Sequence, residues 1–202
     1  MIQMLLWGVI GYFFGSIPFS YIIPLLRGVD VREVGSGNVG GTNALRAAGF
    51  PWGVIAMFLD GAKGFIPSMI ALHYGGMVPS LIAATAAVVG HDYPVWLGFK
   101  GGKGVGSTVG AYFAICPLGG WGFLGSWLLF ALTTKIVSIS SLIGLSVAAV
   151  IGFVVGGPQV GSWSVVMLLL SIFQHRSNIS RLLRGTERRT DLVAMVKRGV
   201  RR

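Results

Sequence analysis

The sequence predicts an all-α integral membrane protein with seven transmembrane helices, its N-terminus outside and its C-terminus in the cytoplasm. Of the 202 residues, 53% are hydrophobic and 11% are charged, whereas an ordinary soluble domain is about 25% charged. The mean hydropathy is +0.77. The 16 Lys and Arg residues exceed the 6 Asp and Glu residues and give a net charge of +10. So few charges cannot cover a water-facing globule, and their positions indicate the topology.

The apolar segments divide into spans of the length that a bilayer requires, about 20 residues each. The first three spans cover residues 4–26, 50–72 and 78–97. Between Lys103 and Lys135 lie 31 uncharged residues, and between Lys135 and His175 lie 39. The longer stretch contains a turn rich in Gly and Pro at 155–161, which divides it into two spans. The shorter stretch is either one long helix or two short helices separated at 116–120.

The basic residues decide between these alternatives, because Lys and Arg in short loops stay in the cytoplasm. With seven spans, 15 of the 16 basic residues fall on one side and only Lys63 lies within a span. With six spans, the same residues divide as 5 and 10 between the two sides. Seven spans are therefore predicted. Several tryptophans fall near the span ends, where aromatic residues are typical.

The rest of the composition is typical of one membrane domain, residues 1–187, followed by a basic cytoplasmic tail, 188–202. The 32 glycines suit close helix packing in lipid, where small residues let backbones approach. The first segment has no basic n-region and no small-residue cleavage site, so it is interpreted as a span and not as a cleavable signal peptide. The single cysteine, Cys116, is interpreted as a small core residue.

The loop after the first span concentrates glycines and hydrogen-bond donors. Gly35, Gly37 and Gly40 match the G-x-G-x-x-G pattern, but this pattern indicates a dinucleotide site only between a strand and a helix. Here the glycines would permit tight turns that direct backbone N–H groups at one anion. The accompanying side-chain donors and cation are Ser36, Asn38, Thr42, Asn43 and Arg46. The alternative is a flexible polar loop with ordinary turn glycines.

The loop after the third span contains Gly-Gly-Lys-Gly at 101–104, at the start of a predicted helix. A nucleotide-hydrolysing Walker A loop is not supported, because neither Ser nor Thr follows Lys103 and no glycine stands five residues before Gly102. What remains is a lysine in a glycine-rich turn at a helix start, which suits phosphate. Lys103 is therefore a candidate phosphate ligand, whereas topology alone explains Lys100.

The chain leaves the seventh span through a segment in which His175, Asn178 and Arg181 recur every three residues. On a helix, these three side chains would share about a third of the circumference. They combine a potential base, an amide and a guanidinium. The alternative, a solvated basic helix on an anionic membrane surface, suits Arg184 and the basic residues beyond it. Glu187 can orient the arginines by ion pairing.

Charged residues within the spans are also candidates, because such charges are costly and usually paired. Asp60 and Lys63 lie three residues apart in the second span, and we interpret them as a structural pair that supports the site, with direct substrate contact as the alternative. His91, near the end of the third span, is interpreted as structural support. Ser141 lies at the cytoplasmic start of the sixth span.

Together, the cytoplasmic ends supply cations and neutral donors that suit a ligand with one or two phosphates. The sequence has no catalytic carboxylate pair and no Cys/His zinc spacing, and no metal is predicted. No histidine is followed five residues later by aspartate, so the familiar His-x4-Asp acyltransferase dyad is missing. Nucleic-acid binding is not predicted, because membrane topology explains the basic residues.

These motifs, in this order, resemble the bacterial glycerol-3-phosphate acyltransferases that use acyl phosphate as the donor. The resemblance runs nearly end to end. It rests on three cytoplasmic motifs: GSGNVGGTN at 35–43 with Arg46, GFKGGKGV at 98–105, and HRSNISRL at 175–182 with Gly185 and Glu187. FLDGAKG at 58–64 and GHDYP at 90–94 are also similar. Gly41, where the family pattern has alanine, departs from it without touching a proposed polar contact.

The resemblance implies an enzyme of the bacterial inner membrane whose active site faces the cytoplasm. It would transfer a fatty acyl chain from acyl phosphate to the sn-1 hydroxyl of glycerol 3-phosphate, forming lysophosphatidic acid and phosphate. No cofactor and no obligate protein partner are expected, and the lipid bilayer is the surrounding partner. The resemblance also implies that a substrate phosphate assists proton removal, with His175 as the alternative general base.

Under this hypothesis, the candidate residues form three groups. The donor phosphate and carbonyl would be held by Ser36, Thr42, Asn43, Arg46 and Lys103, with Gly37, Asn38 and Gly102 in the same loops. Glycerol 3-phosphate would be held by Ser141, His175, Asn178 and Arg181, with Glu187 beside them. Structural support would come from Asp60, Lys63 and His91. The predicted catalytic residues among them are Ser36, Arg46, Lys103 and His175.

Two other classes of protein remain as alternatives. Basic residues at helix ends also suit a transporter or flippase for a small phosphorylated metabolite. That class would favour inverted repeats, which the sequence does not show. A non-catalytic lipid-binding module would depend on the basic tail and not on Lys103.

Overall fold

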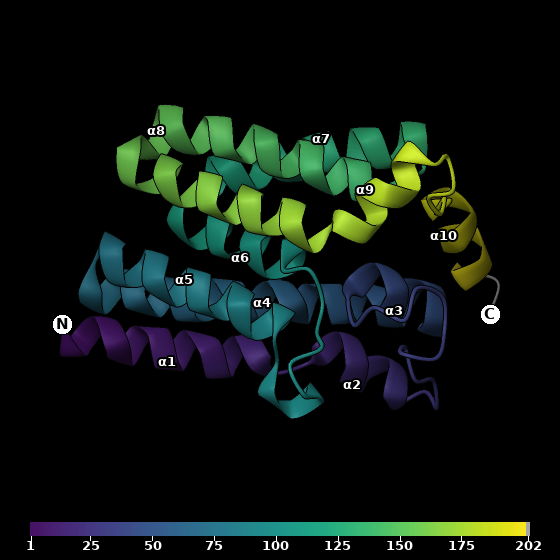
Figure 1. Cartoon of the computed structure of the whole chain (residues 1–202), viewed down its shortest axis with the longest axis horizontal. Helices are drawn as coiled ribbons and strands as arrows, with labels where there is room; N and C mark the ends of the chain where they lie inside the picture. The colour runs from purple at the N-terminus through teal and green to yellow at the C-terminus, as the bar shows by residue number, and fades with distance from the viewer. Residues whose placement is uncertain (201–202) are drawn as a thin grey trace. The chain divides into compact units, whose positions relative to one another are not determined.

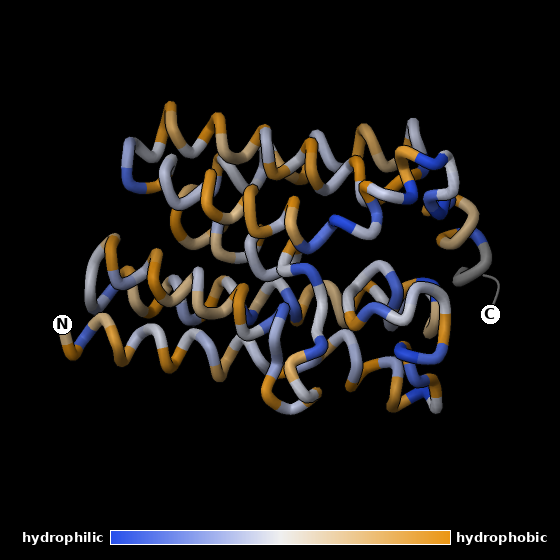
Figure 2. Tube along the Cα trace, viewed as in Figure 1, coloured by the Kyte–Doolittle hydropathy of each residue, from blue (hydrophilic) through white to orange (hydrophobic). Residues whose placement is uncertain are grey.

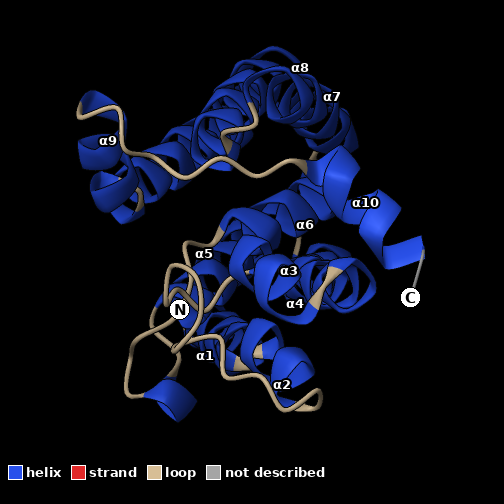
Figure 3. Cartoon of the chain, turned by 90° about the vertical axis from the view of Figure 1, so that its right-hand side faces the viewer, coloured by secondary structure: helices blue, strands red, loops and turns tan. Residues whose placement is uncertain are grey.

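The computed structural model describes residues 1–200, and its regular structure in that range is entirely helical (Figures 1 and 3). The predicted all-helical class is therefore confirmed for the described residues. The chain divides into two compact units, Met1–Ile115 and Cys116–Arg202. We call them unit 1 and unit 2.

Unit 1 consists of α-helices and one short 3-10 turn. Its elements are α1 (Ile2–Ser16), α2 (Phe19–Leu25), α3 (Gly41–Ala48), α4 (Phe50–Gly75), α5 (Met77–Asp92), η1 (Val95–Leu97) and α6 (Val105–Ile115). Helix α1 packs against α5, and α4 packs against α5 and α6. Gly15 of α1 lies against the backbone of Ala87, and Gly64 of α4 lies against the backbone of Ser107, so closely that a Cβ would overlap. Small residues thus permit the close helix packing expected in a membrane protein.

Two predicted spans of unit 1 are interrupted near prolines, which lack a backbone donor. The predicted span 4–26 forms α1 and α2, separated at Ile17 and Pro18. In the predicted span 78–97, the α-helix ends at Asp92, and Pro94 precedes the η1 turn. The helix boundaries in these two segments therefore differ from the bounds of the predicted spans.

Unit 2 contains α7 (Pro117–Thr134), α8 (Val137–Gln174), α9 (Arg176–Leu183) and α10 (Leu192–Val200). Gly157 has a φ of 75° and interrupts α8 directly before Pro158, which confirms the turn predicted at 155–161. The two halves of α8 fold back on each other (Figure 1), and Gly161 lies against the Phe153 ring. The break predicted at 116–120 lies at Cys116, between α6 and α7.

The helix surfaces are suited to contact lipid. Within residues 1–200, three helical stretches are long and apolar enough to cross a membrane, and they are Ile2–Leu25, Phe50–Gly75 and Val137–Gln174. Hydrophobic residues recur along the long helices (Figure 2). Large apolar side chains remain exposed there, including Phe58 at 74% and Val154 at 79%. Such a surface is costly in water and favourable in a bilayer.

The described part of the tail contains a helix, α10. Just before it, the Thr190 N–H donates to the Lys135 carbonyl at 2.7 Å, and Lys135 Nζ lies 2.5 Å from an Asp191 carboxylate oxygen. Exposed Val193 and Lys197 on α10 combine apolar and basic character, as in helices that lie at a membrane interface. The predicted tail extends to 201–202, which lie outside the described residues.

Candidate active site

Asn43 of α3 fixes the loop that precedes it. The side chain is 2% exposed, and its Nδ2 donates to the Val31 and Val34 carbonyls at 2.7 and 3.0 Å. Its Oδ1 accepts the Ser36 N–H at 3.0 Å. Both amide hydrogens and the carbonyl oxygen are therefore used inside the protein. The sequence predicted that Asn43 contacts the acyl donor directly. This geometry instead favours a role in positioning the loop.

The same loop and α3 carry the other candidates from the first motif. Ser36 is exposed, and its Oγ accepts the Asn38 N–H at 3.4 Å across Gly37. Thr42 and Arg46 are half-buried and lie four residues apart on α3, so they are neighbours on one helix face.

The second glycine-rich loop lies against the end of α5. The Gly102 N–H donates to the His91 carbonyl at 3.1 Å. Gly102 has no room for a side chain, because a Cβ there would overlap His91 Nε2 and would lie 2.7 Å from the Val39 carbonyl oxygen. Val39 lies at the end of the first loop, so the two predicted phosphate-binding loops meet at Gly102. Lys103, half-buried, follows directly. We call the candidates on these two loops and α3 the loop cluster: Ser36, Gly37, Asn38, Thr42, Asn43, Arg46, Gly102 and Lys103.

Unit 1 also buries a charged network beside these loops. Asp60 and Lys63 of α4 are 2% and 1% exposed, and Lys63 Nζ lies 3.0 Å from Asp60 Oδ1. The other carboxylate oxygen accepts a hydrogen bond from Ser20 Oγ at 2.5 Å. His91 Nδ1 lies 3.6 Å from Asp60 Oδ1. The spacing of three residues permits the ion pair between Asp60 and Lys63, and the structure contains it. His91, on α5, lies beside the same carboxylate.

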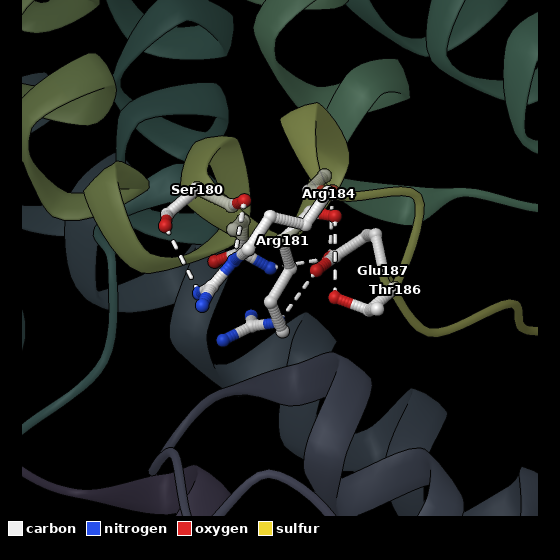
Figure 4. Close-up of polar contacts among 7 residues, drawn as sticks. Ser180, Arg181, Arg184, Thr186 and Glu187 are labelled. Atoms are coloured by element: carbon white, nitrogen blue, oxygen red, sulfur yellow. Dashed lines mark hydrogen bonds and ion pairs between the residues drawn. The ribbon is translucent and has the colours of Figure 1, made fainter.

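In unit 2, Glu187 joins the start of α8 to α9. One carboxylate oxygen accepts hydrogen bonds from Ser138 Oγ at 2.8 Å and Asn178 Nδ2 at 2.5 Å. The other accepts a hydrogen bond from Arg181 Nε at 2.7 Å (Figure 4). The predicted pairing of Glu187 with an arginine is therefore confirmed for Arg181. Sequence reasoning did not assign Ser138 to the site, although it lies three residues before the candidate Ser141. We call Ser138, Asn178, Arg181 and Glu187 the Glu187 cluster.

His175 lies between α8 and α9 and is 4% exposed. Its Nδ1 lies 2.8 Å from the Ser171 carbonyl oxygen, which can only accept a hydrogen bond. This contact places a proton on Nδ1, so in the neutral ring Nε2 is the basic nitrogen. The predicted candidate Ser141 is 4% exposed. Within residues 1–200, no three His, Cys, Asp or Glu side chains gather closely enough to hold a metal ion.

The pKa of Glu187 reflects two opposing effects. Burial raises the pKa of this carboxyl, but the hydrogen bonds from Asn178, Ser138 and Arg181 lower it by more, so the folded-state pKa lies below the ordinary value. The stability that this group contributes is therefore complete above its unfolded-state pKa and is lost as the pH falls through its folded-state pKa.

We expect Glu187→Gln to flatten the dependence of thermal stability on acidic pH. Between about pH 6 and about pH 3, the melting temperature of the unmodified protein should fall more than that of the variant, because only the carboxylate loses favourable interactions on protonation. Thermal unfolding in detergent across this range measures the difference. Parallel curves for the two proteins would contradict the assignment.

The sequence matches the family model for glycerol-3-phosphate acyltransferase over residues 5–185. This chain belongs to that family. A glycerol-3-phosphate acyltransferase of Pseudothermotoga lettingae is 46% identical over 200 residues, covering 96% of this chain and 98% of the relative. A family member of Aquifex aeolicus is 45% identical over 185 residues, covering 90% and 96% of the two chains.

Crystal structures of PlsY (YgiH), an integral membrane glycerol 3-phosphate acyltransferase of this family, are similar over nearly the whole chain. The glycerol 3-phosphate form has a TM-score of 0.90 and 41% identity, covering 96% of this chain and 98% of the solved chain. The lysophosphatidic acid form has a TM-score of 0.87 and 42% identity, covering 92% and 94%. The acyltransferase family indicated by the sequence motifs is therefore confirmed, and the chain has the integral membrane fold of this family.

Proposed function

We propose that this protein transfers a fatty acyl group from acyl phosphate to the sn-1 hydroxyl of glycerol 3-phosphate. Membership in the glycerol-3-phosphate acyltransferase family is the observation that carries the proposal. The solved relative exists in forms with glycerol 3-phosphate and with lysophosphatidic acid, which are an acceptor and a monoacylated product. The choice of donor is supported by the cations in glycine-rich loops and by the missing His-x4-Asp dyad.

The reaction requires positioning and charge stabilisation more than covalent help from the protein, because acyl phosphate is already activated. The acceptor hydroxyl oxygen attacks the acyl carbonyl carbon and forms the ester bond. The bond from that carbon to the phosphate oxygen breaks, and phosphate leaves with the electron pair. The hydroxyl proton passes to a substrate phosphate or to His175 Nε2.

In this proposal, the loop cluster binds the donor. Lys103 and Arg46 balance the charge of the donor phosphate, and the side chains of Ser36 and Thr42 donate hydrogen bonds to the phosphate or the carbonyl. Backbone groups near Gly37, Asn38 and Gly102 complete the anion-binding turns. Asn43 positions the first loop.

The acceptor is assigned to unit 2. Arg181 binds the phosphate of glycerol 3-phosphate, with its guanidinium oriented by Glu187. Asn178 and Ser141 hold the polar groups of the acceptor, and His175 is the alternative base. Because Glu187 also accepts a hydrogen bond from Asn178, one buried carboxylate orients two of the proposed acceptor ligands.

The membrane topology in this proposal is seven spans, with the N-terminus outside and the active site on the cytoplasmic face of the bacterial inner membrane. The distribution of 15 of the 16 basic residues supports it through the positive-inside rule. Cysteines introduced singly into the loops, in a Cys116→Ser background, can be labelled from outside in whole cells. Labelling at 73–77 but not at 98–103 agrees with this orientation, and the reverse pattern contradicts it.

The donor is tested by giving the purified protein glycerol 3-phosphate with palmitoyl phosphate, palmitoyl-CoA or palmitoyl acyl carrier protein. Of these three donors, we expect only palmitoyl phosphate to support turnover. Turnover only with a thioester would contradict the donor assignment. Counterflow of glycerol 3-phosphate across liposomes without any turnover would identify a transporter.

We expect Gly102→Ala to lower kcat/KM for acyl phosphate by about tenfold or more. The added methyl group would overlap His91 and the Val39 carbonyl oxygen, and a displacement of about 1 Å at a reacting site can cost about 100-fold. Gly125→Ala in α7 is the matched control, since a Cβ there meets open space. Equal rates for the two variants would show that the close approach at Gly102 does not matter for activity.

A further inference from the structure

The buried charged network of unit 1 holds both sides of the break in the first span. Lys63 Nζ donates to the Ile17 carbonyl at 2.8 Å, which is the last backbone group before Pro18. Ser20, on the other side of the break, donates to Asp60 Oδ2. The ion pair on α4 therefore fixes the geometry at which α1 gives way to α2.

His91 connects this network to the loop that carries Lys103. Its Nδ1 lies 3.6 Å from Asp60 Oδ1, and its Nε2 lies 2.0 Å from the position that a Cβ of Gly102 would take. The imidazole ring is thus held between a buried carboxylate and the turn that precedes Lys103. Backbone hydrogen bonds from Gly102 to the His91 carbonyl and from Gly101 to the Asp92 carbonyl, each 3.1 Å, attach the turn to the end of α5.

Stability alone gives a weak reason for such a network. Buried ion pairs often contribute no more stability than apolar residues of similar volume, because removing the charges from water is costly. Within a membrane span, ionisable residues are by default associated with function. Here the network ends at a loop that carries a proposed catalytic residue, and Asp60 Oδ1 lies 3.6 Å from the ring against which that loop packs.

We propose that Asp60 and His91 are positioning residues for Lys103. Asp60 orients the His91 ring, and the ring fixes the turn at Gly102 and with it the place of the Lys103 ammonium group. This inference rests on the proposed function, in which Lys103 binds the donor phosphate. Neither Asp60 nor His91 touches a substrate in this proposal.

A double-mutant cycle between His91 and Lys103 tests the inference on the full-length protein in lipid nanodiscs. His91→Ala should lower kcat/KM for palmitoyl phosphate by about tenfold and leave the KM for glycerol 3-phosphate within about twofold. In a Lys103→Ala background, the same substitution should change the residual kcat/KM by less than about twofold, because residues that act through one another are not additive. The same tenfold loss in both backgrounds, or no loss in either, would overturn the proposal.

Ser80→Ala is the matched control. Ser80 is a buried residue of the same helix, and its hydroxyl donates to the Ser68 carbonyl at 2.8 Å, so its effect should be equal in both backgrounds. If His91→Ala does not fold, His91→Phe retains the ring volume and removes the contact with Asp60.

A second measurement does not depend on activity. An amine-reactive reagent, quantified by mass spectrometry, should be blocked from Lys103 by palmitoyl phosphate in the unmodified protein and blocked less in the His91 variants. Equal protection of Lys103 in the unmodified protein and in the His91 variants would contradict the positioning role. If palmitoyl phosphate protected Lys103 in the unmodified protein but no turnover occurred, the proposed function would be contradicted instead.

Discussion

Lys103→Ala is expected to lower kcat/KM for acyl phosphate by about 10²- to 10³-fold, the range found when one preorganised donor to a developing anion is removed. The reason is the charge that collects on the phosphate as it leaves the acyl carbon. A lysine held in a turn fixed by Gly102 and His91 can stabilise that charge without reorganising. Initial rates of phosphate release over a series of acyl phosphate concentrations measure the effect.

The neighbouring Lys100 provides the control for this prediction. It lies in the same loop and is exposed, and the positive-inside rule explains its charge. Lys100→Ala should retain nearly full activity. A similar loss in both variants would show that the loop needs only positive charge and would remove the specific role of Lys103.

The largest effect on stability is expected for Asp60→Ala. This substitution leaves the Lys63 ammonium group buried without its carboxylate, and breaking a buried pair in this way typically costs about 3–5 kcal/mol. The variant should therefore unfold at a much lower temperature in detergent. Thermal unfolding followed by circular dichroism or tryptophan fluorescence measures the shift.

Two further variants distinguish the effect of an unpaired buried charge from the effect of losing any carboxylate. Asp60→Asn combined with Lys63→Met removes both charges and should recover much of the lost stability, because no uncompensated charge remains. Asp30→Ala removes a half-buried surface carboxylate that pairs with the exposed Arg32 at 2.6 Å and should have only a small effect. A double variant as unstable as Asp60→Ala would contradict the ion-pair explanation.

Features set by neighbours in the sequence could be predicted from it. The turn at 155–161 follows from Gly and Pro within an apolar stretch, and Gly157 does adopt a positive φ there. The spacing of Asp60 and Lys63 permits their ion pair, because residues three apart share a helix face. Glycine-rich packing of helices follows from composition.

Features that depend on contacts between distant segments could not be predicted in the same way. Ser138 and Glu187 are 49 residues apart, and no local pattern pairs them. His91 could be recognised as structural, but its contact with Asp60 depends on the packing of α5 against α4. The break at Pro18 is different, because a local proline signals it; hydropathy did not register it, since the residues on both sides are apolar.

The amide of Asn43 shows why the residue types in a motif do not determine their roles. Its position among polar residues beside Arg46 fits a ligand contact, but in the structure it holds Val31, Val34 and Ser36 together. A buried amide must satisfy its own hydrogen bonds, and here the loop backbone meets that need.

In the proposed function, acyl transfer and phosphate release are one reaction of this protein. The most direct test is to incubate the purified enzyme with palmitoyl phosphate and glycerol 3-phosphate and to quantify lysophosphatidic acid by mass spectrometry and phosphate by colorimetry in the same samples. We expect equal amounts of the two products, and neither product above the uncatalysed background when acyl phosphate is omitted. Phosphate release without lysophosphatidic acid, or no release at all, would contradict it.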